Sequence, residues 1–220
     1  MIFPTLCIDN FFTNLNEIIK FSKSLSYAPD INGKYPGERT KEIHLIDSDF
    51  FNYCTSKMIA SLYPNDWRNM SWSASSTFQK IKGLWQEQGW VHQDVTEISC
   101  IIYLEGDENC GTSLFKQITH KSMDIKSQGI RQDGNLDSNK IKTKEYNEAR
   151  KKSNQRFKKT ISFDSIPNRC IMFDSSQYHA VNNYNNSKQG ERLTLITFFD
   201  SIKRNDGQQL KYHTIEAKRI

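Results

Sequence analysis

Two of the five histidines in this 220-residue chain lie where they could bind a metal ion. His92 and Asp94 are separated by one residue, and side chains two positions apart in a strand point to the same face. His179 follows a strongly strand-like run, so it could supply a third ligand from another strand. Two imidazoles and one carboxylate on one face of an iron ion leave positions open for a bidentate cosubstrate and dioxygen. The pattern therefore predicts a non-haem Fe(II) site at His92, Asp94 and His179.

An arginine begins one of the most apolar runs of the chain, residues 192–199. A cation in such surroundings needs a counter-ion. A keto acid with a distal carboxylate would supply one, because the planar guanidinium group binds carboxylates in a bidentate manner. We expect Arg192 to anchor such a cosubstrate. The alternative is a structural salt bridge from Arg192 to Asp174 or Glu191.

The elements that must position these residues are mostly strands. Runs of β-branched, aromatic and small residues have strand length rather than helix length, and turn-rich connections separate them. A series of short strands like this is typical of a sandwich or jelly roll. The expected strands span residues 72–84, 97–104, 112–118, 160–163, 169–173 and 192–199.

Two helices are expected before the first long strand. From about residue 13 to residue 26, apolar side chains recur at helical spacing, and Asp9 or Asn10 could cap this helix. A second helix is expected over residues 48–62, and Pro64 would stop it. The first helix needs an apolar surface to cover, which the predicted sheets can provide.

A long polar and basic insertion, residues 119–159, separates two of the predicted strands. Residues 116–159 contain 13 Lys/Arg and 5 Asp/Glu, whereas the whole chain has a net charge of only +5. Loops of this length are typically functional lids or disordered segments, and residues 142–158 could form a solvated helix. A nucleic-acid partner is possible but not favoured, because Tyr146 and Phe157 are the main aromatic residues available for base stacking.

Composition favours one cytoplasmic domain over residues 1–220. The chain is long enough for one substantial core, and 12% aromatic residues argue against general disorder. Its five cysteines form no C-x-x-C pair, so neither a disulfide framework nor a thiolate zinc site is expected. No export signal begins the chain, and no stretch approaches the roughly 18 apolar residues of a membrane span.

Several segments occur in the order of those in a known family. They are Ile8–Phe12, His92-Gln93-Asp94, Cys100–Leu104, Cys110–Phe115, His179 and Arg192. Over most of residues 6–200 the chain resembles the prolyl-hydroxylase-like branch of the 2-oxoglutarate and Fe(II)-dependent oxygenases. Residues 35–39, Tyr-Pro-Gly-Glu-Arg, are similar to a segment of uncharacterised bacterial and phage members.

The resemblance implies a double-stranded β-helix, with the N-terminal helices packed on its larger sheet. It implies that Fe(II) is held by His92, Asp94 and His179, and that 2-oxoglutarate is bound by Arg192 with help from Tyr103 and Thr194. The implied reaction is hydroxylation of a small molecule, such as an amino acid, or of a peptide or protein residue. Dioxygen would be consumed, and succinate and CO2 released.

Two other readings remain. A non-catalytic jelly-roll module, which binds metal or a partner, is expected to lack one of the ligands or the arginine, and none is missing. A cupin-like metalloenzyme without a keto acid would usually have more histidine ligands, and would leave Arg192 without a purpose. Neither substrate identity nor oligomeric state follows from the sequence.

Overall fold

Two antiparallel β-sheets form the body of the protein. The computed structural model describes residues 3–82, 88–119, 125–184 and 191–207. The larger sheet has the strand order β1-β8-β5-β10-β4-β3-β2, and the smaller sheet has the order β7-β6-β9. The strands are β1 (Leu6–Ile8), β2 (Ala28–Pro29), β3 (Glu38–Arg39), β4 (Met70–Lys82), β5 (Ile98–Glu105), β6 (Thr112–Gln117), β7 (Phe157–Phe163), β8 (Cys170–Asp174), β9 (Tyr178–Val181) and β10 (Glu191–Arg204).

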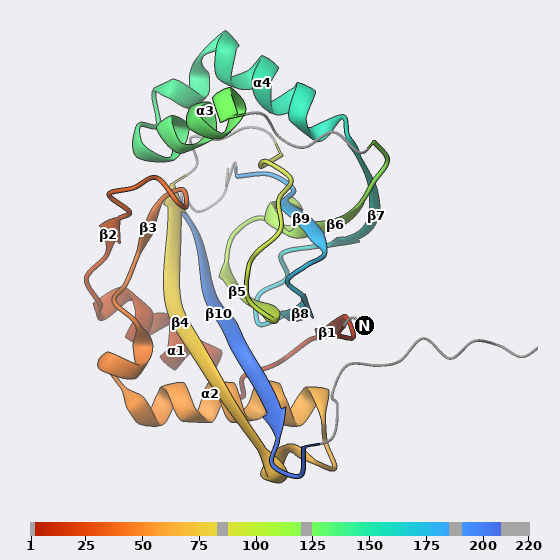
Figure 1. Cartoon of the computed structure of the whole chain (residues 1–220). Coiled ribbons are helices and arrows are strands. Elements are labelled where there is room, and N and C mark those ends of the chain that lie inside the picture. The colour runs from red at the N-terminus through yellow and green to blue at the C-terminus, as the bar shows by residue number, and fades with distance from the viewer. Residues whose placement is uncertain (1–2, 83–87, 120–124, 185–190, 208–220) are drawn as a thin grey trace, which may run out of the picture.

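Helices cover the outer face of the larger sheet, and a second pair lies at one end of the molecule (Figure 1). Within the described ranges, no helix is both long and apolar enough to cross a membrane. The α-helices are α1 (Leu15–Ser24), α2 (Ser48–Leu62), α3 (Ile125–Leu136) and α4 (Lys144–Asn154), and the short 3-10 helices are η1 (Ile43–Leu45), η2 (Trp67–Asn69), η3 (Glu108–Cys110) and η4 (Lys140–Lys142).

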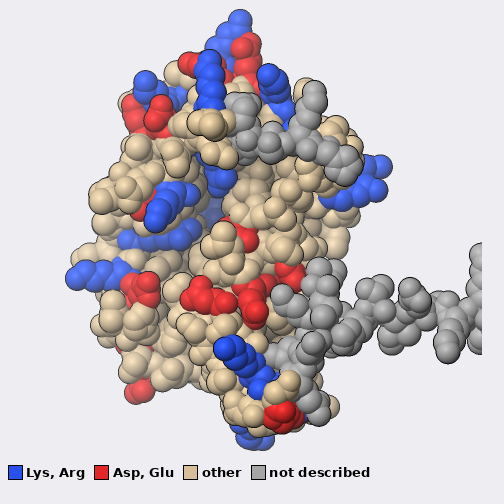
Figure 2. Space-filling view, viewed as in Figure 1, with Lys and Arg blue, Asp and Glu red and all other residues tan. Residues whose placement is uncertain are grey.

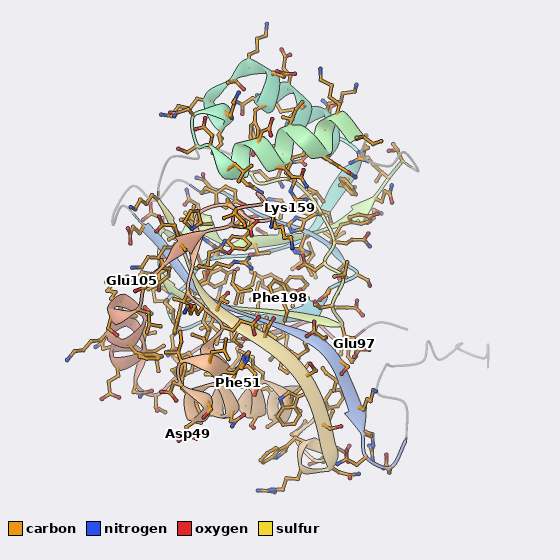
Figure 3. The ribbon with its side chains drawn as sticks, turned by 60° about the vertical axis from the view of Figure 1, so that its left-hand side comes forward. Asp49, Phe51, Glu97, Glu105, Lys159 and Phe198 are labelled. Carbon is orange, nitrogen blue, oxygen red and sulfur yellow. The ribbon has the colours of Figure 1, made fainter. Side chains whose placement is uncertain are left out.

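The six strands that were given residue ranges are all present, and β10 continues five residues past its expected end, to Arg204. The end of the first one, residues 83 and 84, lies outside the described residues. Strand β10 alternates as its sequence indicates, because Leu193 and Leu195 enter the main core on one face while Arg192 and Ile196 line a cavity on the other. Figure 3 shows Phe198 of β10 and Phe51 of α2 on opposite sides of the larger sheet.

The main core lies between the larger sheet and helices α1 and α2. Met58 and Ile59 of α2 are fully buried there with Phe78 of β4, and Ile18 of α1 joins the same cluster. The N-terminal helices therefore pack on the larger sheet as expected. The predicted cap of α1 is wrong: the helix begins after Asn14, and Asp9 instead forms an ion pair with Arg169, 2.6 Å between Oδ1 and Nε.

The insertion is a pair of packed helices over the described part, which excludes residues 120–124. Gly134 of α3 has no room for a Cβ because the ring of Tyr146 in α4 lies against it. The expected solvated helix is partly wrong, since α4 buries Tyr146, Arg150 and Ser153. Asn154 of α4 also donates to the Gly89 carbonyl oxygen and accepts from the Val91 amide, so it holds the segment that leads to His92.

The turn before β6 gives a first testable prediction. A Cβ on Gly111 would overlap the backbone carbonyl of Phe163 in β7, so Gly111→Ala requires the smaller sheet to shift. We expect a loss of about 1–3 kcal/mol in the free energy of unfolding, measured by urea denaturation. The matched control is Gly129→Ala in α3, where a Cβ meets nothing within 4 Å. That variant should be unchanged or up to about 1 kcal/mol more stable, and equal losses in both variants would contradict the assignment.

Candidate metal centre and its cavity

Three potential metal ligands converge between the two sheets. His92, Asp94 and His179 each offer one ligand atom, and these atoms all lie within 4.8 Å of one another. The Asp94 carboxylate faces both rings, with Oδ1 3.7 Å from His92 Nε2 and Oδ2 3.2 Å from His179 Nε2. The two rings are 4.4 Å apart, centroid to centroid. The structure thus brings together the three residues that the sequence singled out.

Backbone carbonyls set the orientation of both rings. Nδ1 of His92 lies 2.9 Å from the Trp90 oxygen, and Nδ1 of His179 lies 2.9 Å from the Gln177 oxygen. Because a carbonyl oxygen can only accept, each Nδ1 carries the proton. Each Nε2 faces Asp94 and is the atom that would bind a divalent metal in the neutral ring.

The chain positions His92 through pairing with the strand that carries His179. The two residues form an antiparallel bridge, with N–O distances of 3.0 and 2.8 Å in the two directions. The expected strand at residues 92–94 is therefore wrong: only this isolated bridge forms. Asp94 is aligned separately, because its amide donates to the Ser175 carbonyl oxygen at 3.0 Å.

The surroundings favour the protonation states that bind metal. Burial and the positive charges of His179 and Arg131 together lower the pKa of His92 to about 3, against the raising effects of the Asp94 charge and the Trp90 carbonyl. Burial alone would raise the pKa of Asp94, but the hydrogen bond and charge of His179, the charge of His92 and a hydrogen bond from Ser99 together lower it. Ser99 Oγ lies 3.0 Å from Asp94 Oδ2 and is itself bonded to Ser175. At neutral pH the site holds a neutral His92 and a charged Asp94.

Arg192 occupies a buried corner of the cavity that the three candidate ligands also line. It is 2% exposed, lines the cavity, and donates from Nε to the Cys110 carbonyl oxygen at 2.8 Å. Its guanidinium carbon lies 5.6 Å from the centroid of the Tyr103 ring. Among the described residues, no carboxylate lies within salt-bridge distance of it. The structural salt bridge to Asp174 is therefore absent within that part, where Asp174 instead accepts from Phe3 and Ser176.

The two expected helpers of Arg192 lie in the same corner behind the cavity wall. Tyr103 and Thr194 are opposite each other in the β5–β10 register, and both are fully buried. The Tyr103 hydroxyl donates to Thr112 Oγ1 at 2.8 Å, and Thr112 lines the cavity. Burial raises the pKa of Tyr103 to about 12, so this hydroxyl is protonated. Thr194 Oγ1 has no hydrogen-bond partner among the described residues, and its role stays a prediction.

The cavity around the centre measures about 820 Å³. Helix α3 covers part of it through Gln128 and Gln132, while β10 contributes Ile196 and Phe198 to its wall. Figure 2 shows Lys and Arg side chains inside a hollow on the face that it displays. Space of this size suits a cosubstrate together with a small molecule or one extended side chain.

The sequence from residue 3 to residue 199 matches the family described as "Family of unknown function (DUF6445)". The chain belongs to this family. No curated protein matches the sequence.

Solved structures show the same fold in proteins of very different sequence. The alpha-ketoglutarate-dependent epimerase SnoN from nogalamycin biosynthesis is 10% identical, with a TM-score of 0.54, over 98% of this chain and 86% of that one. HygX from Streptomyces hygroscopicus, with nickel and 2-oxoglutarate bound, is 10% identical, with a TM-score of 0.51, over 89% and 82%. A 2OG-Fe(II) oxygenase family oxidoreductase from Burkholderia pseudomallei is 13% identical, with a TM-score of 0.52, over 89% and 85%. The predicted double-stranded β-helix is thereby confirmed.

This DUF6445 protein also has cavity residues that sequence reasoning did not single out. Arg39, Arg131 and Tyr184 line the cavity from three separate segments. Arg39 belongs to the Tyr-Pro-Gly-Glu-Arg segment, so a signal existed for it, but nothing in the local sequence marks the other two. Of the remaining histidines, His44 pairs with Glu42 on the surface, and His120 and His213 lie outside the described residues.

Proposed function

We propose that this protein is an Fe(II)- and 2-oxoglutarate-dependent oxygenase that hydroxylates a small molecule or a peptide residue. The observation that carries the proposal is the convergence of two imidazole Nε2 atoms and one carboxylate at a cavity beside a buried arginine. The fold shared with SnoN and HygX supports it, since those proteins are named for alpha-ketoglutarate dependence or have 2-oxoglutarate bound.

The ligand atoms fit Fe(II) in both number and chemistry. His92 and His179 would each bind through Nε2, and Asp94 through a carboxylate oxygen, while the carbonyls at Nδ1 keep the rings oriented. Bound iron supplies the redox chemistry that couples reduction of dioxygen to decarboxylation of 2-oxoglutarate and oxidation of a C–H bond. The protein's contribution is to fix three ligands on one side and leave the other side facing the cavity.

Arg192 fits the distal carboxylate of 2-oxoglutarate. Its Nε is engaged by Cys110, so the rest of the guanidinium group can receive a carboxylate in the bidentate geometry that arginine favours. Tyr103 would act by orienting Thr112 at the cavity wall. A dicarboxylate bound here would neutralise a buried cation that has no carboxylate partner among the described residues.

The insertion would serve as a roof over the substrate. Helix α3 contributes cavity-lining side chains, and Asn135 fastens it to the opposite wall through a 2.8 Å hydrogen bond to the Gly33 carbonyl oxygen. We include in the proposal a single oxygenase domain with this lid-like insertion, working in the cytoplasm, where its cysteine thiols would stay reduced.

The test is an anaerobic titration of metal-free protein with Fe(II) and then with 2-oxoglutarate, followed in the visible spectrum. We expect a charge-transfer band that needs both additions. Succinate in place of 2-oxoglutarate is the matched control, because it keeps a distal carboxylate but lacks the keto group that chelates iron. Iron binding without a band would favour a cupin-like enzyme that uses no keto acid. No iron binding at all would favour a non-catalytic jelly-roll module.

A further inference from the structure

Two further arginines line the cavity, and among the described residues no carboxylate lies within salt-bridge distance of either guanidinium group. Arg39 comes from β3 at one side of the larger sheet, and Arg131 comes from α3 in the roof. Among the described residues neither guanidinium group forms a hydrogen bond or an ion pair, and Arg39 Nε is buried without a partner. Both guanidinium groups therefore keep unused donors at the cavity.

Local packing holds Arg39 in place. Its guanidinium carbon lies 3.8 Å from the centroid of the Tyr35 ring, at the distance of a cation–π contact. The turn before it is fixed because Gly37, at φ +72°, lies against the Lys80 backbone, and because Gln79 donates to the Pro36 carbonyl oxygen at 2.8 Å. Stacking on a ring face leaves the edge of the guanidinium group, with its N–H donors, available.

The charged residues that line the cavity are nearly all positive. Besides the metal ligands, the lining residues that carry charge are all basic: Lys34, Arg39, Arg131, Arg156 and Arg192. Asp94 is the one lining carboxylate among the described residues, and the proposed metal would use it. Burial lowers the pKa of Arg39 and of Arg131, yet guanidinium stays protonated in proteins. An unpaired charge in such a place costs folding free energy, so a ligand that neutralises it is expected.

Arg39 is distinct from the corner that holds Arg192. Arg39 pairs with Gln79 of β4, whereas Arg192 lies on β10, on the other side of β4. Two strand spacings put their backbones about 10 Å apart. The Arg192 guanidinium group points toward Cys110 and toward Tyr103 of β5. Arg192 is thus the cation placed for a cosubstrate, while Arg39 lies on a different strand and is available to another anion.

We propose that Arg39 and Arg131 bind an anionic group of the substrate, a carboxylate or a phosphate, and so place the rest of the substrate at the metal centre. This inference rests on the proposed oxygenase function and narrows its substrate class to anionic compounds. Two guanidinium groups that present several N–H donors suit an oxyanion with two or three acceptor oxygens.

The binding test uses the protein with Fe(II) and saturating 2-oxoglutarate, kept anaerobic. The probes are matched pairs at about 10 mM in which the partner carries no oxyanion: butanoate with butanamide, glutarate with glutaramide, and ethyl phosphate with ethanol. We expect at least one anion to raise Tm by about 2 °C or more and to perturb the charge-transfer band, while its neutral partner does neither. The carboxylate and phosphate arms identify which oxyanion is bound.

The variants Arg39→Gln and Arg131→Gln should weaken binding of that anion at least tenfold, yet form the 2-oxoglutarate band as the unmodified protein does. Without ligand, their Tm should be unchanged or higher, because each removes an unpaired cation. Arg68→Gln, an exposed arginine beside Trp67, is the control and should change neither quantity.

Three results would overturn the inference. The first is a normal charge-transfer band in the unmodified protein with none of the anions bound. The second is a fall of several degrees in the ligand-free Tm of both variants, which would show that the arginines are structural. The third is loss of the band in the Arg39 variant, which would assign Arg39 to the cosubstrate. A missing band in the unmodified protein would instead count against the proposed function, and the Tm measurements would then decide on the anion site separately.

Discussion

Replacing Asp94 by alanine is expected to weaken Fe(II) binding by more than 100-fold and to abolish 2-oxoglutarate turnover. The Asp94 carboxylate faces the Nε2 atoms of His92 and His179, and it brings the negative charge that two neutral imidazoles lack. Changes in residues that merely orient a metal ligand cost about 10–100-fold in affinity, so loss of a charged ligand should cost more. Equilibrium dialysis of the anaerobic protein against Fe(II) measures the affinity, and succinate release measures turnover.

Gln93→Ala is the matched control for this variant. Gln93 lies between the two ligands, but its side chain is exposed and bonds only the Ser176 carbonyl oxygen among the described residues. The Gln93→Ala variant should bind Fe(II) with an affinity within about threefold of that of the unmodified protein, because the substitution removes one exposed hydrogen bond of roughly 1 kcal/mol or less. Equal weakening in both variants would show that residues 92–94 matter for local folding, and would contradict direct coordination by Asp94.

The convergence of the three candidate metal ligands could be predicted because their chemistry is scarce and their order is informative. His92, Asp94 and His179 are found from residue type and from the strand-like run that precedes the second histidine. Their local geometry could not be predicted. The expected strand at residues 92–94 is only a bridge, because its position depends on the β9 backbone and on the Ser175 carbonyl, both about 80 residues away in sequence.

The strands and the second helix could be predicted from periodicity, since the alternate residues Leu193 and Leu195 of β10 enter the main core and the helix 48–62 ends before Pro64. The cap of α1 and the structure of the insertion were harder to predict from the sequence. Asp9 has a capping side chain but pairs with Arg169 from a distant turn. The insertion is polar, and what orders it is the contact between Gly134 and Tyr146, which composition does not reveal.

The proposed anion site at Arg39 and Arg131 shows the same limit more sharply. Arg39 and Arg131 are 92 positions apart, and each would be read alone as an ordinary surface arginine. Only the fold places both at one cavity, with one donor of Arg39 buried and unpartnered. Sequence patterns report what a residue does within its own element, whereas a site built from three elements depends on tertiary packing.

Replacing Arg192 by glutamine is expected to lower the affinity for 2-oxoglutarate by about 100- to 1000-fold and to leave Fe(II) binding nearly unchanged. The guanidinium group is buried and lacks a carboxylate partner among the described residues, so the distal carboxylate would be bound by a desolvated, charge-assisted pair. Loss of one partner from such a pair costs about 2–5 kcal/mol. Titration of 2-oxoglutarate into the anaerobic Fe(II) protein, followed by the charge-transfer band, gives the affinity.

Two further variants separate binding from folding. Arg192→Lys keeps the charge but loses the planar fork, so its affinity should lie between those of the glutamine variant and the unmodified protein. Arg204→Gln removes an arginine from the other end of β10, where it pairs with Asp66 and Asp206 at the surface, and should leave 2-oxoglutarate affinity unchanged. If Arg192→Gln kept its affinity but lost stability in urea, the bond from Arg192 to the Cys110 carbonyl would be its main role. A loss of affinity without a matching loss of stability is the result that the buried, uncompensated guanidinium group predicts.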